Sequence, residues 1–123
     1  MKITPKVLVV DDNLDIQNIY TLMCQQEGFE VQVAKDGLDG ISKAVSFKPD
    51  VILLDLMMPQ MDGYEMLEAM RKNTSLDVKI IILSNIAQQK DIDKATKLGA
   101  DMYLPKADNE PDQVMEKIKE ILK

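Results

Sequence analysis

Continuous apolar runs rich in β-branched residues recur along the chain. The three clearest are residues 7–10, 51–54 and 80–83. Runs without polar alternation are typical of strands covered on both faces, as in the middle of a parallel sheet. Residues 30–33 instead alternate polar and apolar side chains, and residues 102–104 end at Pro105. Both patterns indicate edge strands, which meet solvent and tolerate proline.

Helical patterns fill the intervals between these runs. Apolar residues recur at helical spacing within residues 16–23, 64–70, 92–98 and 114–122, and a shorter helix is expected over 37–46. Asn13 and Asp62 suit N-caps, Gly99 suits a left-handed helix end, and Pro111 suits a first helical turn. The order is (βα) five times, which predicts a doubly wound α/β domain. With the edge strands second and fifth, we expect a parallel sheet in the order 2-1-3-4-5 between two helical layers.

Composition narrows the possible functions. The 123 residues are expected to form a single domain, 1–123, without an output domain, and 46% of them are hydrophobic. The net charge of −6 disfavours direct binding to nucleic acid. Histidine is absent and Cys24 is the only cysteine, which excludes histidine bases, Ser-His triads and an internal disulfide. No apolar run reaches the roughly 20 residues of a membrane span, so we expect a soluble, cytoplasmic protein.

Polar residues follow the predicted strands at one edge of the sheet. These residues are Asp11, Asp12, Asp55, Ser84 and Lys106. Ligands bind at the carboxyl ends of strands in such sheets, near the switch point between the first and third strands. Taken singly, the acidic pair fits a loop or cap, the serine a turn and the lysine a solvated charge. Asp55 is harder to explain this way, because a charge directly after four apolar residues is costly unless it is paired or used. Their convergence favours a functional site.

The residue types at this edge indicate phosphoryl chemistry. Clustered carboxylates raise one another's pKa unless a cation intervenes, and Mg²⁺ prefers oxygen ligands and often shares a phosphate. A lysine and a hydroxyl suit phosphoryl oxygens, and a carboxylate can act as a nucleophile to form an acyl phosphate. We therefore expect Asp55 to accept a phosphoryl group.

Four motifs resemble the receiver domain of two-component response regulators, a family with a flavodoxin-like fold that includes the chemotaxis regulator. The motifs are VLVVDDN (7–13), VILLDLMMPQMDGYEML (51–67), IIILSN (80–85) and LGADMYLPK (98–106). The resemblance extends over nearly the whole chain, and the segment DLMMPQMDG is specific by itself.

The resemblance implies a role for each matching residue. Asp55 would take phosphate from a phosphohistidine of a sensor histidine kinase or phosphotransfer protein. Mg²⁺ would bind Asp12, Asp55 and the Met57 carbonyl, with Asp11 acting largely through a metal-bound water. Ser84 and Lys106 would contact the phosphoryl group, Tyr103 would be the switch aromatic, and Pro59 and Gly63 would shape the loop after Asp55. The fourth helix, fifth strand and fifth helix would present the changed surface to a downstream target, with the chain a monomer or weak dimer.

The sequence departs from the family pattern near this site. Lys106 is followed by Ala107, where the family usually has proline after a cis bond. A cis bond without proline costs about 2.5–4 kcal/mol, so we expect a trans bond and a rearranged loop that puts the reach of Lys106 in question. Asn85 is larger than the usual residue and is expected to narrow access to Asp55. Met57 and Ile86 are both apolar, which predicts slow hydrolysis of the acyl phosphate.

Other functions fit the sequence less well. An aspartyl phosphatase of the haloacid-dehalogenase type needs aspartates two positions apart, whereas Asp11 and Asp12 are adjacent. A nucleotide- or flavin-binding domain would need a glycine-rich first loop, and here the acidic pair would repel phosphate without a metal. A phosphorylation-independent pseudo-receiver that serves only as an interaction module is the remaining alternative.

Overall fold

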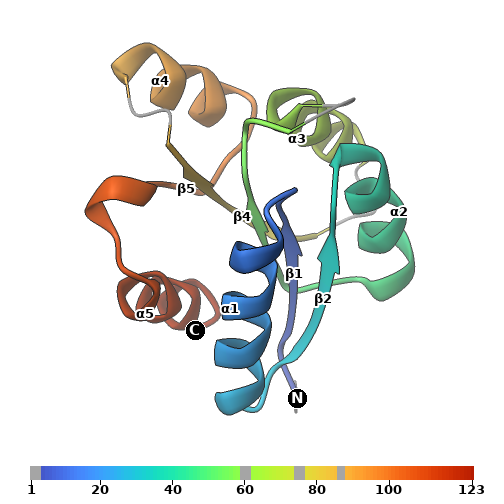
Figure 1. The fold of residues 1–123 in the computed structure, drawn as a ribbon. Coiled ribbons are helices and arrows are strands. Elements are labelled where there is room, and N and C mark those ends of the chain that lie inside the picture. The colour runs from blue at the N-terminus through green and yellow to red at the C-terminus, as the bar shows by residue number, and fades with distance from the viewer. Residues whose placement is uncertain (1–3, 59–61, 74–76, 86–87) are drawn as a thin grey trace.

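A computed structural model describes residues 4–58, 62–73, 77–85 and 88–123 (Figure 1). Strands and helices alternate from the first strand to the last helix. The strands are β1 (Lys6–Val10), β2 (Glu30–Ala34), β3 (Val51–Leu54), β4 (Lys79–Ser84) and β5 (Met102–Pro105). The helices are α1 (Leu14–Gln26), α2 (Gly37–Phe47), α3 (Gly63–Lys72), α4 (Gln89–Lys97) and α5 (Pro111–Ile121). A short 3₁₀ turn, η1 (Lys106–Asp108), follows β5.

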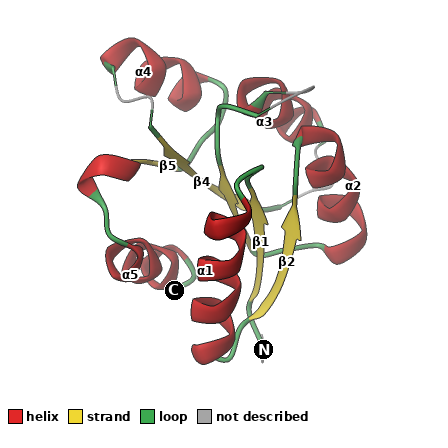
Figure 2. Cartoon of the chain, in the orientation of Figure 1, coloured by secondary structure: helices red, strands yellow, loops and turns green. Residues whose placement is uncertain are grey.

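The five strands form one parallel sheet in the order β2-β1-β3-β4-β5. This confirms the predicted order and places the two polar or proline-terminated strands at the edges. Ribbons coloured by secondary structure show the sheet between two groups of helices (Figure 2). The fold is the predicted doubly wound three-layer sandwich.

Two apolar clusters hold the helices against the sheet. One joins side chains of α1 and α5 to the face of the sheet that carries Val9 and Leu53. The other joins α2, α3 and α4 to the opposite face, which carries Leu8 and Ile52. The central strands β1 and β3 are buried on both faces, as their unbroken apolar runs predict.

The helix ends follow the predicted signals. The Asn13 side chain accepts a hydrogen bond from the Ile16 amide, and Asp62 forms a reciprocal capping box with Glu65. Gly99 has a φ of 110°, the left-handed region expected after α4. Within the described part of the chain, no helix is long and apolar enough to cross a bilayer.

Candidate functional site

The register of the sheet brings the acidic residues together. Val10 of β1 pairs with Leu54 of β3, so Asp11 and Asp55 are the next residues on adjacent strands. Backbone hydrogen bonds continue one residue past each strand, from the Asp55 amide to the Val10 carbonyl and from the Asp11 amide to the Ala34 carbonyl, both at 3.0 Å. The carboxyl edge of the sheet thus fixes both aspartates from the backbone, as the strand ends predict.

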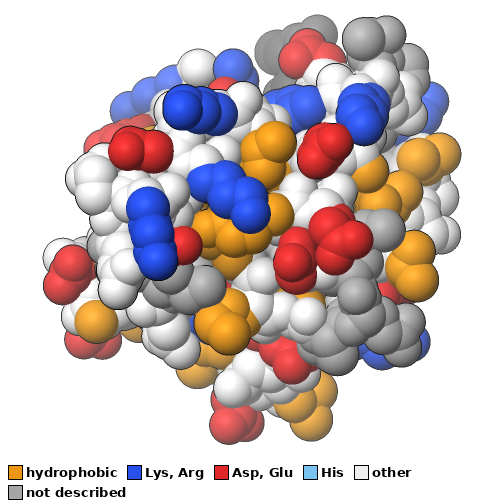
Figure 3. All heavy atoms as spheres, turned by 90° about the horizontal axis from the view of Figure 1, so that it is seen from above, with side chains coloured by type: hydrophobic (Ala, Val, Ile, Leu, Met, Phe, Trp, Pro, Cys, Tyr) orange, Lys and Arg blue, Asp and Glu red, His pale blue; other side chains and the backbone are white. Residues whose placement is uncertain are grey.

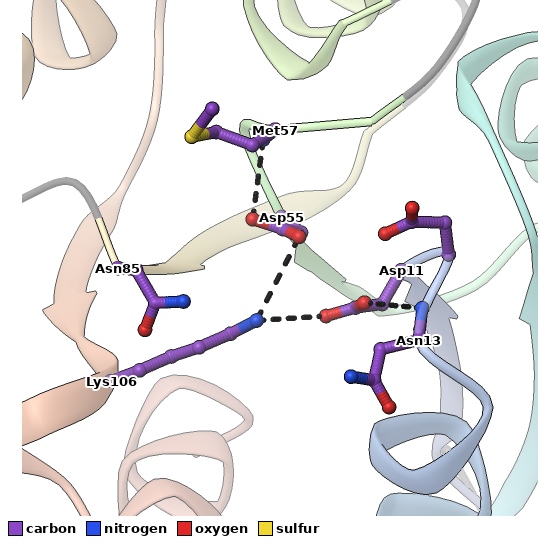
Figure 4. A pocket seen from close by; sticks show the side chains of 7 residues that line it. Asp11, Asn13, Asp55, Met57, Asn85 and Lys106 are labelled. Carbon is purple, nitrogen blue, oxygen red and sulfur yellow. Dashed lines mark hydrogen bonds and ion pairs between the residues drawn. The ribbon is translucent and has the colours of Figure 1, made fainter.

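These residues border a hollow of about 200 Å³ at the carboxyl edge (Figure 4). Its walls are Asp11, Asp12, Asn13, Asp55, Met57, Asn85 and Lys106. Acidic and basic side chains lie side by side on the face of the molecule viewed from above (Figure 3). Asn85 is exposed and borders the hollow, at the position where the sequence predicts narrowed access to Asp55.

Lys106 lies between the two buried aspartates. Its Nζ is 3.3 Å from Asp11 Oδ2 and 3.7 Å from Asp55 Oδ2, and its side chain is only 19% exposed. The described peptide bonds are all trans, including the one between Lys106 and Ala107, as expected. The turn η1 follows β5 directly, and the Asn109 side chain donates a 2.9 Å hydrogen bond to the Pro105 carbonyl across this turn. The lysine therefore reaches the site without the usual Lys-Pro sequence.

Asp55 lies in an unfavourable electrostatic environment. Burial, followed by repulsion from Asp11, raises the pKa of its carboxyl group above the usual value. The Lys106 ammonium and a 3.2 Å hydrogen bond from the Met57 amide to Oδ1 act in the opposite direction but do not cancel the increase. The site thus has more negative charge than the lysine offsets.

The carboxylates can hold a divalent cation. Asp11, Asp12 and Asp55 each offer an oxygen, and these three oxygens lie within 4.8 Å of one another. An all-oxygen set with excess negative charge is suited to Mg²⁺, which keeps several waters and needs few carboxylates. The donor set therefore fits the predicted cofactor.

Ser84 and Tyr103 lie on the adjacent strands β4 and β5 and are not among the residues that line the hollow. Ser84 ends β4 and is completely buried. Burial and the nearby Asp91 raise the pKa of the Tyr103 hydroxyl, whereas a hydrogen bond with the Ser84 side chain lowers it. Ser84, a predicted phosphoryl contact, and Tyr103, the predicted switch aromatic, are therefore hydrogen-bonded to each other.

Gly63 approaches the backbone next to Asp55. A Cβ atom at this position would lie 2.5 Å from the Asp55 carbonyl oxygen and 2.6 Å from Leu56 Cα, so a side chain would displace the start of α3. This close approach explains why glycine suits the first position of α3. Pro59 and Ile86, two further residues of the predicted site, lie outside the described ranges.

Two residues near the site make hydrogen bonds to Asp11 that the sequence does not predict. Asn13 caps α1 as predicted, and its backbone amide also donates to Asp11 Oδ1 at 2.9 Å. The Gln17 side chain donates to the Asp11 carbonyl at 2.6 Å. The position of Gln17 one turn into the helix after the acidic pair is a signal that could have drawn attention to it.

Known proteins resemble this chain in sequence and in fold. Relatives include the CpxR homolog of Haemophilus influenzae, a transcriptional regulatory protein 36% identical over 96% of this chain, and the DNA-binding regulator RpaA of Synechocystis, 34% identical over 83%. The chain spans 50% and 43% of those two proteins, respectively. Chemotaxis protein CheY4 of Vibrio cholerae has a TM-score of 0.90 with 28% identity, over 97% of this chain and 99% of that one.

The family-level match covers almost the whole domain. The response regulator receiver domain family matches residues 7–119, from the second residue of β1 to the last turn of α5. The matched range contains every residue described above at the carboxyl edge of the sheet. The chain therefore belongs to the receiver domain family of two-component response regulators.

Proposed function

We propose that Asp55 accepts a phosphoryl group from a phosphohistidine on a sensor histidine kinase or phosphotransfer protein in the cytoplasm, in a reaction that depends on Mg²⁺. The observation that carries the proposal is the placement of the Lys106 ammonium within 4 Å of both Asp55 and Asp11 at an acidic hollow. This arrangement favours a phosphoacceptor over a pseudo-receiver, because the lysine remains in reach despite Ala107.

In the proposed reaction, the charged side chains of the site take part in the transfer of the phosphoryl group. A carboxylate oxygen of Asp55 forms a bond to phosphorus as the phosphorus–nitrogen bond breaks, and the imidazole leaves with the electron pair. Lys106 would move from the Asp55 carboxylate to the phosphoryl oxygens. Bound Mg²⁺ would offset negative charge on the carboxylates and on the transferring group. Asp12, Asp55 and the Met57 carbonyl would supply the protein ligands, with Asp11 acting largely through a metal-bound water.

We propose that the signal then passes through Ser84 and Tyr103. Phosphorylation adds charge and strong acceptor oxygens beside a buried hydroxyl. Ser84 would turn toward a phosphoryl oxygen and release its hydrogen bond with Tyr103. Tyr103 would then settle inward and alter the surface formed by α4, β5 and α5, where a downstream protein would bind. The domain in this view is a signalling phosphoacceptor, with DNA effects left to a partner or a separate domain.

Intact mass after incubation with acetyl phosphate and Mg²⁺ tests the proposal. Wild type should gain one phosphoryl group, Asp55→Asn none, and the exposed-aspartate variant Asp15→Asn should behave as wild type. Decay of the adduct after donor removal should be slow, because Met57 offers no polar group to orient water. Failure of wild type to form an adduct would support the pseudo-receiver, and an adduct on Asp55→Asn would place the phosphate elsewhere.

A further inference from the structure

The two members of the acidic pair are held in different ways. The Asp11 carboxylate is buried and receives hydrogen bonds or ion pairs from the Asn13 amide at 2.9 Å and the Lys106 ammonium at 3.3 Å. The Asp12 carboxylate is exposed, and among the described residues none donates to it. The position of Asp12 therefore depends on its backbone.

The backbone at the acidic pair lies beyond the sheet ladder, because β1 ends at Val10. The Asp11 amide is fixed by its 3.0 Å hydrogen bond to the Ala34 carbonyl. The Asp11 carbonyl points toward α1 and accepts the 2.6 Å hydrogen bond from Gln17 Nε2. These two contacts fix the peptide groups on either side of Asp11, and the second of these groups leads directly into Asp12.

Gln17 is well placed to hold this carbonyl. The Gln17 backbone amide donates to the Asn13 carbonyl at 3.1 Å in the first turn of α1. The Gln17 side chain therefore projects from an ordered helix. It is half-buried and six residues from its acceptor, and the contact ties the first helix to the loop that carries both acidic side chains. Loss of the amide would leave the Asp11 carbonyl without this donor and free the peptide to rotate.

We propose that Gln17 is a positioning residue for the cation site: by holding the Asp11 carbonyl, it orients Asp12 toward the oxygens of Asp11 and Asp55. The inference rests on the proposed function for its cation but concerns a residue that contacts neither cation nor phosphate. Outer hydrogen bonds of this kind orient metal ligands and raise affinity. One neutral hydrogen bond corresponds to about a threefold to tenfold effect on an equilibrium constant.

Gln17→Met tests the inference, since methionine has a similar length and no donor. Gln25→Met, which changes an exposed residue of the same helix, is the matched control. Mn²⁺ affinity measured by electron paramagnetic resonance, with Mg²⁺ as competitor, should fall about threefold to tenfold in Gln17→Met only. The ¹⁵N resonance of the Asp12 amide should shift in the same variant, because its peptide carbonyl has lost a donor. A purely packing role for Gln17 would not produce both changes.

The phosphorylation rate as a function of Mg²⁺ separates positioning from chemistry. In Gln17→Met, half-saturation should move to higher Mg²⁺ while the rate at saturation stays near that of wild type. Unchanged cation affinity, a rate that does not recover at saturating Mg²⁺, or a wild type that binds no Mn²⁺ would each overturn the inference. A wild type that forms no phosphoryl adduct, yet binds the cation more tightly than Gln17→Met, would overturn the proposed function and support the role of Gln17.

Discussion

At the scale of single residues, the charge of Asp55 lowers the stability of the folded protein. The carboxyl group is buried, lies beside Asp11, and has a pKa raised mainly by burial. An ionised group in such a place costs free energy unless partners offset the loss of water. Lys106 at 3.7 Å and the Met57 amide at 3.2 Å provide only part of this compensation. The excess negative charge therefore favours the binding of a cation beside Asp55.

The raised pKa of Asp55 determines how the stability of the protein changes with pH. Between the unfolded value, about 3.9, and the higher folded value, the native state binds more protons than the unfolded state, so stability falls as pH rises. Without Mg²⁺, Asp55→Asn should therefore increase the free energy of unfolding at pH 7, and its advantage should shrink as pH falls through the folded pKa. Urea unfolding across this pH range checks the prediction, with exposed Asp15→Asn as control. A lower stability of Asp55→Asn at pH 7 would contradict it.

The same residues show what sequence could predict at this scale. Asp11, Asp12 and Asp55 were identifiable because each follows an apolar run whose strand end has a known place in the sheet. The contact of Gln17 with the Asp11 carbonyl and that of Ser84 with Tyr103 were not identifiable. Both depend on side-chain rotamers and on the rotation of a helix about its axis, which spacing along the chain does not determine.

At the scale of elements, Arg71 joins three segments around the end of α3. Its guanidinium donates to the Gly99 carbonyl at 2.9 Å, the Val78 carbonyl at 2.8 Å and the Asp101 carboxylate at 2.8 Å. The Asp101 carboxylate also accepts from the Ile80 amide at 2.8 Å. Strand ends were predictable to within one residue, whereas the apolar periodicities differed from the helix ends by up to three residues. This junction was not predictable, because its partners lie 7 to 30 residues away in the chain.

Replacement of Arg71 should loosen this junction. Arg71→Met keeps much of the apolar stem but removes the donor to two backbone carbonyls and the ion pair with Asp101, which should lower the free energy of unfolding by about 1–3 kcal/mol. Lys72→Met removes a neighbouring charge whose side chain is 74% exposed, and should change stability by less than about 0.5 kcal/mol. Chemical denaturation of the three proteins measures the difference. Equal stability of the two variants would show that the junction contributes little.

At the scale of the whole molecule, the charge distribution separates two effects of a cation. The chain has a net charge of −6, so any salt lessens its self-repulsion. A cation bound by Asp11, Asp12 and Asp55 has a further effect, because the three carboxylates come together only when the sheet has formed. Sequence predicted this convergence through strand order, whereas the 4.8 Å cluster itself required the folded backbone.

Mg²⁺ should therefore raise the melting temperature beyond the effect of ionic strength. A ligand that binds only the folded state, at about one hundred times its dissociation constant, adds about 2.7 kcal/mol, which corresponds to roughly 10 °C for a domain of this size. Asp12→Asn should lose most of this increase, whereas Asp15→Asn, which removes the same charge from the exposed start of α1, should keep it. Thermal unfolding in MgCl₂ and in NaCl of equal ionic strength distinguishes the two contributions. Because screening acts on the net charge and not on one carboxylate, an equal increase in wild type and Asp12→Asn would show that Mg²⁺ acts on the molecule as a whole rather than at this site.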